Sequence, residues 1–339
     1  MAAPLDLRRV TADRSLLGSL EHVRNVGLGG VLDGDGRGYR ARRARPTGAA
    51  VTHGYAWRFV DQWTQIWWPQ GIAVGEHSGV PTALVSWYAQ PRRRGAMGAR
   101  ISVVDLRNPS HATYRHVLLV APRQTDAGVV LDPVPVHAGG IVWAGDRLFV
   151  AATLDGILEF RLSDILRADS RGPFGRASGP FHHRYLLPVF ARYQPTLPKN
   201  DNRMRYSFLS LETGQGDAAS GAASDLRMLA GEYATDDGRR VARLTLTDAG
   251  CTVTEAHVPR VPHMQGVALV GDRWYVSSGH GGVHGGDLWS GPIDNLRKSD
   301  GVLPPGPEAL AFWPSHNELW SVSEVAGRRW LFAIDQTRF

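Results

Sequence analysis

Short apolar runs separated by glycine-containing turns recur along the chain from about residue 70 to its end. Five segments repeat one order: an apolar strand, a tight turn, a second strand rich in Val, Trp, Tyr or Ser, a turn with glycine, and a third strand. This order predicts an antiparallel meander in each segment, because tight turns with glycine join neighbouring antiparallel strands. The segments begin at Gln70, His137, Arg205, Gln265 and Glu308.

A further extended stretch follows each of the first three segments, at residues 115–122, 184–192 and 252–259. Each stretch can add a fourth, outer strand, and four antiparallel strands per repeat make the blade of a β-propeller. We therefore predict an all-β fold, a five-bladed β-propeller with four-stranded antiparallel blades. A six-bladed propeller is the alternative if residues 20–65 contain a further blade.

The two ends of the chain are expected to meet in the last blade. The fifth segment stops after its third strand, so the residues before Gln70 are left to supply the outer strand and to remove free sheet edges. We therefore divide the chain into an N-terminal segment with a closing strand, residues 1–65, and the propeller, residues 66–339, within a single domain. Helix-like patterns occur only at residues 15–24 and 162–168.

The composition excludes several protein classes. With 39 Gly and 21 Pro among 339 residues, the chain has too many helix-breaking residues for a helical bundle, and its 43% hydrophobic content can fill a large core. No apolar run approaches the roughly 18 residues that cross a bilayer, so we expect no membrane partner. The single cysteine, Cys251, excludes an internal disulfide and a multi-cysteine metal site.

The net charge of +6 comes almost entirely from arginine, since all but two of the 38 basic residues, Lys199 and Lys298, are Arg. We attribute this excess to the codon usage of a GC-rich genome, because the arginines are scattered and a phosphate-binding face needs a dense basic stripe. We expect a monomer without a nucleic-acid partner.

The repeats resemble the β-propeller superfamily over residues 66–339. Four stretches look like those of a group of secreted actinobacterial propeller proteins: WWPQGIAV, VHAGGIVWAGDRLFVA, MQGVALVGDRWYVSS and GPEALAFWPSHNELWSVSE. If the resemblance extends to export, it implies a secreted protein whose signal peptide preceded Ala2, with a cytoplasmic protein as the alternative. It implies no chemistry, because unrelated functions share propeller folds.

The repeat alignment brings polar residues from distant parts of the sequence to one face of the predicted propeller. Loops that lead into the first strand of a blade and loops that leave its second strand lie on the same face. A buried polar group without a partner costs about 1–3 kcal/mol, so polar residues gathered at the axis predict a ligand pocket. Those before or at the first strands are Trp67, Trp68, Gln70, His137, Arg203, Arg205, His263, Gln265 and Glu308; those after the second strands are Trp87, Tyr88, Thr153, Asp155, Glu232, Tyr233, His280, His284 and Glu324.

Three residues of this set, His137, Glu308 and Glu232, are the candidate catalytic acids and bases. The structural alternatives are a hydrogen bond between blades for His137 and a channel salt bridge with Arg205 for Glu308. Arg203 and Arg205 fit a carboxylate or phosphate clamp, with an ion pair between blades as the alternative. The candidate substrate-binding residues are Trp67, Trp68, Gln70, Tyr88, Arg205, Tyr233, Gln265, His280 and Glu324.

An aromatic stretch, residues 57–68, precedes the first blade and contains four Trp. Together with Tyr88 it predicts a wall that holds a substrate ring, and packing between the terminal blades is the alternative. Gln70 and Gln265 stand at equivalent repeat positions, where they either orient a substrate or seal the interface between blades.

Metal binding is weakly indicated. His280, His284 and Asp287 have ligand-like spacing, but they stand in a Gly-rich loop where spacing fixes no geometry. The string with Asp33 and Asp35 lacks the further acidic ligands of a calcium loop. Nucleophile-elbow, zinc-protease and phosphate-loop motifs are absent from the sequence. We therefore expect neither a metal nor a cofactor.

These observations lead to a metal-independent acid–base enzyme that acts on a small organic or carbohydrate-like substrate in the axial pocket, by hydrolysis, elimination or cyclisation. The alternative is a non-catalytic propeller that binds a glycan or a protein through the same face. Glycoside cleavage needs two carboxylates about 5–10 Å apart, and only Glu308, Glu232 and Glu324 could supply them.

Overall fold

The computed structural model describes residues 7–34, 38–90, 97–126, 128–168, 183–196, 203–212 and 226–339. β-strands make up most of this described part, and its only α-helices are the short α1 (Gly27–Leu32) and α2 (Phe59–Trp63). No helix among these residues has the length and apolar character needed to cross a membrane. The chain is therefore nearly all β, as the repeats predict.

Most strands assemble into antiparallel groups of four that follow one another along the chain. The first group is β5 (Trp67–His77), β6 (Val80–Ala89), β7 (Ala99–Asp105) and β8 (His111–Thr125). The second is β10 (Ile141–Ala144), β11 (Arg147–Ala151), β12 (Ile157–Arg161) and β14 (Tyr185–Pro195). The third is β15 (Phe208–Leu211), β16 (Leu226–Gly231), β17 (Val241–Leu246) and β18 (Gly250–His257).

The last two groups bring the ends of the chain together. The fourth is β19 (Met264–Val270), β20 (Arg273–Ser278), β21 (Gly286–Gly291) and β22 (Arg297–Leu303). The fifth is β23 (Pro307–Trp313), β24 (Glu318–Ser323), β25 (Trp330–Ile334) and β4 (Val51–Ala56). Its outer strand, β4, thus comes from the N-terminal segment.

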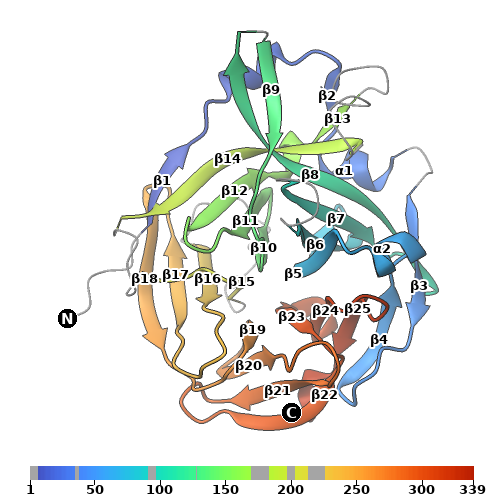
Figure 1. The fold of residues 1–339 in the computed structure, drawn as a ribbon, viewed down its shortest axis with the longest axis vertical. Helices are drawn as coiled ribbons and strands as arrows, with labels where there is room; N and C mark the ends of the chain where they lie inside the picture. Colours follow the sequence, from blue (N-terminus) through green and yellow to red (C-terminus); the bar gives the residue numbers. More distant parts are fainter. Residues whose placement is uncertain are drawn as a thin grey trace.

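The first strands of the groups lie nearest the centre of the molecule, and the outer strands lie at its periphery (Figure 1). Neighbouring first strands contact one another in the order β5, β10, β15, β19, β23 and back to β5. Glycine permits this close approach: a Cβ atom on Gly140 would lie 2.0 Å from the backbone nitrogen of Leu209, and one on Gly266 would lie 2.5 Å from that of Leu310. Antiparallel sheets packed around a common centre are the architecture of a β-propeller.

Hydrogen bonding does not divide the molecule into separate blades. Additional strands join the outer strands of neighbouring groups, and β8 pairs in parallel with β14, so that only β19–β22 remain a separate sheet and the larger sheet does not close. The joining and extending strands are β1 (Leu7–Thr11), β2 (Val23–Asn25), β3 (Tyr39–Ala44), β9 (Gly128–Pro133) and β13 (Leu166–Ala168). The number of blades therefore stays a prediction.

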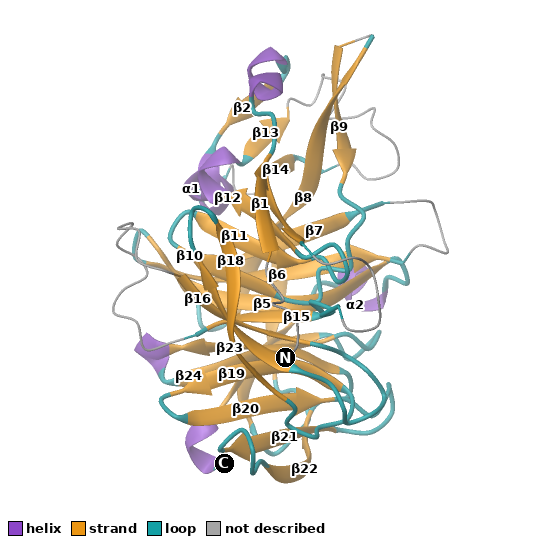
Figure 2. Ribbon diagram, turned by 90° about the vertical axis from the view of Figure 1, so that its left-hand side faces the viewer, coloured by secondary structure: helices purple, strands orange, loops and turns teal. Residues whose placement is uncertain are grey.

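The helix-like patterns of the sequence correspond to short 3-10 turns. Residues 15–24 contain η1 (Ser15–Ser19) and residues 162–168 contain η2 (Leu162–Asp164), each followed by a strand. Each predicted helix-like stretch thus holds a short 3-10 helix and no α-helix, while the glycine-rich α1 and the aromatic α2 were not predicted. The described chain has two further 3-10 turns, η4 (Pro314–His316) and η5 (Gln336–Arg338). The helices α1 and α2 lie on opposite faces of the molecule (Figure 2).

Candidate functional site

Three first strands carry a β-bulge at the equivalent position. The pairing register shifts early in β5, β19 and β23, and the residues at the shifts include Gln70, Gln265 and Glu308. A bulge takes a residue out of the hydrogen-bond ladder and re-aims its side chain. In three repeats, the same β-bulge thus places a polar residue outside the regular strand pairing near the centre of the molecule.

Glu308 is buried, with 2% of its surface exposed. Within the described part of the chain its carboxyl group has no hydrogen-bond or ion-pair partner. Burial and, to a lesser extent, the neighbouring Glu324 carboxyl group raise the pKa of Glu308 well above its usual value, because both disfavour the charged form. Glu308 therefore holds its proton to a higher pH than an exposed glutamate does.

Glu324 follows β24 directly and is half-buried. Its Oε2 atom accepts a hydrogen bond of 2.9 Å from Nε2 of Gln70, which is itself buried. Burial raises the pKa of Glu324 to about 7, although the Gln70 hydrogen bond and the positive charge of Arg329 act in the opposite direction. Glu324 thus titrates close to neutral pH, beside a second carboxyl group whose pKa is also raised.

Tyr88 and His137 complete the site from the first and second groups. The Tyr88 ring, on β6, lies 4.3 Å from the His137 ring between centroids, and the two planes are tilted by 32°. Burial and the charges of Glu324 and Glu308 raise the pKa of Tyr88 to about 12. The His137 side chain keeps solvent access, but the protein around it lowers the pKa of its imidazole by desolvation. Both side chains are therefore neutral at pH 7.

We call Gln70, Tyr88, His137, Glu308 and Glu324 the axial cluster. They come from β5, β6, the segment before β10, β23 and the end of β24. The hydrogen bond, ring contact and electrostatic effects described above connect all five. The repeat alignment thus brings together residues that lie up to 254 positions apart in the sequence.

Arg329 lies beside the axial cluster and is fully buried. Its Nη1 atom donates to the backbone oxygens of Asp61 and Thr64, at 3.0 and 2.7 Å, and its Nε atom donates to the backbone oxygen of Glu324 at 2.7 Å. Its guanidinium carbon lies 5.5 Å from the Trp68 ring centroid. Arg329 therefore ties the end of α2 to the segment that carries Glu324.

Glu232 does not join the axial cluster. Both of its carboxylate oxygens are occupied by Arg240, through Nη2 at 2.7 Å and Nε at 2.9 Å, and the backbone nitrogen of Arg205 also donates to it. Despite burial, these donors lower the pKa of Glu232. Glu232 is therefore an ionised partner of Arg240, whereas the Arg205 side chain is exposed and the Arg203 side chain is buried.

The aromatic stretch divides between different environments. Trp67 is buried beneath the Arg100 guanidinium, 4.5 Å from the ring centroid, and so belongs to the core. Trp57 is also buried, against Trp87. Trp68 is half-buried beside Arg329, and Trp63 on α2 is 54% exposed. Of the predicted aromatic wall, Trp68 and Tyr88 remain available to a ligand.

The remaining predicted substrate-binding residues are partly exposed to solvent or bonded to residues outside the axial cluster. Gln265 is half-buried, and Tyr233 is 39% exposed near the His263 ring. His280 bonds to the buried Asp287, which also pairs with Lys298 at 2.9 Å.

The metal-ligand candidates do not form a cluster. His284 is exposed, Asp33 is exposed, and Asp35 lies outside the described residues. Within the described ranges, no group of three or more His, Cys, Asp or Glu side chains is placed to hold a metal ion.

A buried ionic network near Trp67 was not predicted from the sequence. Asp61 bonds to Nη2 of Arg100 at 3.0 Å, to the Tyr114 hydroxyl at 2.7 Å and to His116 at 3.3 Å, while His116 contacts the Ser102 hydroxyl at 2.9 Å. The order Ser–His–Asp is that of a nucleophilic triad. Ser102 is wholly buried and its hydroxyl also accepts from a tryptophan, so the network stabilises the fold and is closed to substrates.

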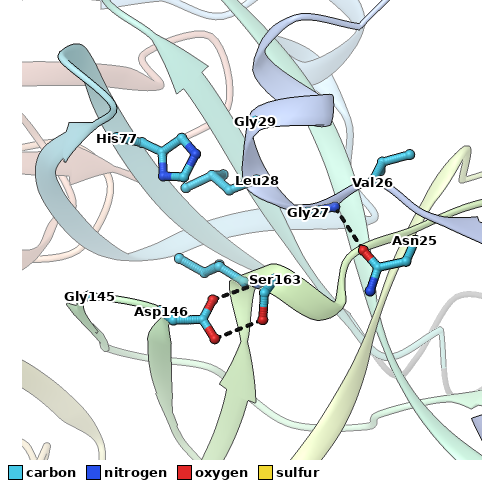
Figure 3. Close-up of a pocket in the computed structure, with 10 residues that line it drawn as sticks. Asn25, Val26, Gly27, Leu28, Gly29, His77, Gly145, Asp146 and Ser163 are labelled. Carbon is cyan, nitrogen blue, oxygen red and sulfur yellow. Dashed lines mark hydrogen bonds between the residues drawn. The ribbon is translucent and has the colours of Figure 1, made fainter. Parts of the chain in front are cut away.

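A surface pocket lies on the opposite face, beside α1 (Figure 3). The Asp146 carboxylate there accepts hydrogen bonds from the backbone and hydroxyl of Ser163, and Asn25 accepts one from the backbone of Gly27. Asp146 thus fixes the start of η2, and Asn25 closes a local turn before α1. The side-chain oxygens of Asp146 and Asn25 are therefore already hydrogen-bonded, whereas the Glu308 carboxyl group of the axial cluster is not hydrogen-bonded within the described residues.

No protein-family model and no curated protein matches the sequence. Among solved structures, the chain is similar to a GH43_1 enzyme from Xanthomonas citri, with 10% identity, a TM-score of 0.41, and 80% of this chain and 88% of that chain covered. It is also similar to the glutaminyl cyclase of Myxococcus xanthus, with 11% identity, a TM-score of 0.40, and 86% and 95% covered. It is similar as well to a gluconolactonase of Xanthomonas campestris, with 15% identity, a TM-score of 0.38, and 88% of this chain and 87% of that chain covered. All three TM-scores are below 0.5.

Proposed function

We propose that the protein is a metal-independent acid–base enzyme whose active site is the axial cluster of a five-bladed β-propeller. Glu308 is the proton donor, and Glu324 is the proton acceptor in its ionised form. The substrate is a small organic or carbohydrate-like molecule. The five four-stranded groups are the blades in this proposal, and the protein acts as a secreted monomer.

The observation that carries the proposal is the unpartnered, buried carboxyl group of Glu308 next to Glu324. Two carboxyl groups whose surroundings separate their proton affinities can serve as acid and base at the same pH. Buried groups that have no structural partner are costly to stability, and such groups concentrate at functional sites. Glu232 has no part in this proposal, because Arg240 occupies both of its oxygens.

The other residues of the cluster have supporting roles. Gln70 fixes the orientation of Glu324 through its amide, and the rings of Tyr88 and His137 form a surface against which a substrate ring can pack. His137, which is neutral and reachable by solvent, can relay protons between the site and bulk water. Such a site serves hydrolysis, elimination or cyclisation, since each requires a positioned acid and base.

The proposal is tested by screening the purified protein for turnover of glycosides, lactones and small metabolites, and by repeating any activity found with variants. Glu308→Gln and Glu324→Gln should each reduce kcat at least about 100-fold. Glu76→Gln is the matched control, because Glu76 lies on β5 but is exposed. Binding of a screened compound without turnover would favour the recognition propeller, and full activity of Glu308→Gln would exclude the acid proposed above.

A further inference from the structure

The axial cluster places two carboxyl groups beside one buried guanidinium group, that of Arg329. In the described residues neither Glu308 nor Glu324 forms an ion pair with a cationic side chain. Arg329 acts on Glu324 electrostatically. It is buried, its Nε and Nη1 atoms donate to backbone oxygens, and its Nη2 atom has no hydrogen-bond partner among the described residues. Tyr88 on β6 and His137 before β10, the other titratable groups at the site, are uncharged at neutral pH.

The hydrogen-bonding capacity of the two carboxyl groups is also largely unused. Gln70 supplies the only side-chain donor to Glu324 in the described chain, and Glu308 receives none. Ionised carboxylates only accept hydrogen bonds, whereas an ammonium group has three donors and no acceptor. A carboxylate or phosphate on a ligand would bring further acceptors and a like charge to the same place.

Aromatic surfaces border the carboxyl groups. The Tyr88 ring stacks near His137, and the Trp68 ring already lies beside the Arg329 guanidinium, so one cation is in contact with this wall. Aromatic rings attract cations through their faces. Carboxyl groups with unused acceptor capacity and aromatic faces thus coincide at one site.

We propose that the axial cluster binds a ligand that carries a protonated amine on a hydroxylated ring, and that it prefers this ligand to its neutral and anionic counterparts. This inference rests on the proposed active site and names its substrate class. The ammonium group lies between Glu308 and Glu324, and the ring packs on Tyr88. Because an ion pair with the amine offsets the cost of a buried charge, Glu308 releases its proton when the ligand binds.

The test uses three compounds with one frame: trans-4-aminocyclohexanol, trans-cyclohexane-1,4-diol and trans-4-hydroxycyclohexanecarboxylate. Their affinities for the full chain are measured by calorimetry at pH 7, in two buffers that differ in ionisation enthalpy. The amine should bind at least about tenfold more tightly than the diol, and the carboxylate more weakly than both. The heat of amine binding should depend on the buffer, which reports proton release.

Variants separate the site from the rest of the surface. The double variant Glu308→Gln, Glu324→Gln should lose the preference for the amine and the proton release, whereas Glu76→Gln should keep both. Thermal unfolding confirms that each variant is folded. His137→Ala should leave the proton release in place, which excludes the imidazole as its source.

The inference is overturned if the diol binds as tightly as the amine, if the carboxylate binds best, if none of the three binds, or if the double variant retains the preference. Amine binding with proton release but no turnover of any amine would support the inference while leaving the acid–base function unsupported. Turnover of a neutral or anionic substrate, with no amine preference, would support the enzyme and contradict the inference.

Discussion

Replacement of the two axial carboxyl groups should change how stability depends on pH. A carboxyl group whose pKa is raised by folding contributes stability that is fully present below its unfolded pKa and is lost as the pH rises toward the folded pKa, because the unfolded chain releases its proton first. Glu308 and Glu324 both have raised pKa values. The native protein should therefore lose stability from about pH 4.5 upward.

The magnitude follows from Glu324. Its pKa rises from 4.5 to about 7 on folding. At about 1.4 kcal/mol per pH unit, this interval of about 2.5 units lowers the unfolding free energy by about 3.5 kcal/mol. Glu308 adds a loss of the same sign. The double variant Glu308→Gln, Glu324→Gln has no proton to release and should lack this loss.

The assay is urea denaturation of the native protein, the double variant and the control Glu76→Gln at intervals between pH 5 and pH 8. The difference in unfolding free energy between double variant and native protein should grow by at least about 2 kcal/mol over this range. The control should follow the native protein. Parallel curves for native protein and double variant would refute the reasoning, because they would mean that neither carboxyl group has a raised pKa.

Further predictions concern the fold and the absence of a metal. Asp61→Asn should lower the unfolding free energy by about 3–5 kcal/mol in chemical denaturation, since it leaves the buried Arg100 without its carboxylate. Gly140→Ala should prevent soluble expression or cost more than about 4 kcal/mol, because its Cβ would overlap the backbone of Leu209, whereas Gly18→Ala should be neutral, as nothing lies within 4 Å of the added atom. Dialysis against EDTA should leave the melting temperature and any turnover unchanged; a fall in either would show that a metal takes part.

The repeat pattern was sufficient to predict strand groups and the gathering of Gln70, Glu308 and His137. It succeeds because each repeat buries the same apolar faces, and glycines such as Gly140 allow the first strands to approach. It could not predict the separation of Trp67 from Trp68, since a β-bulge immediately afterwards decides which side chain faces the core.

The repeat pattern also could not distinguish the roles of Glu232 and Glu324. Both follow a second strand, but a nearby loop places Arg240 on Glu232, while the Glu324 carboxyl group accepts a hydrogen bond from the amide of Gln70. Loop conformation, which the strand pattern does not encode, thus selects the carboxyl group that stays available. The Asp61 network joins α2 to β7 and β8 and follows no repeat position.

The most direct test is a carbon-13 NMR titration of the glutamate side-chain carboxyl groups, with signals assigned through Glu308→Gln and Glu324→Gln. The proposed chemistry requires the Glu308 carboxyl group to be protonated at pH 7 and the Glu324 carboxyl group to titrate near pH 7. Titration of both groups near 4.5, as in a solvent-exposed glutamate, would contradict it.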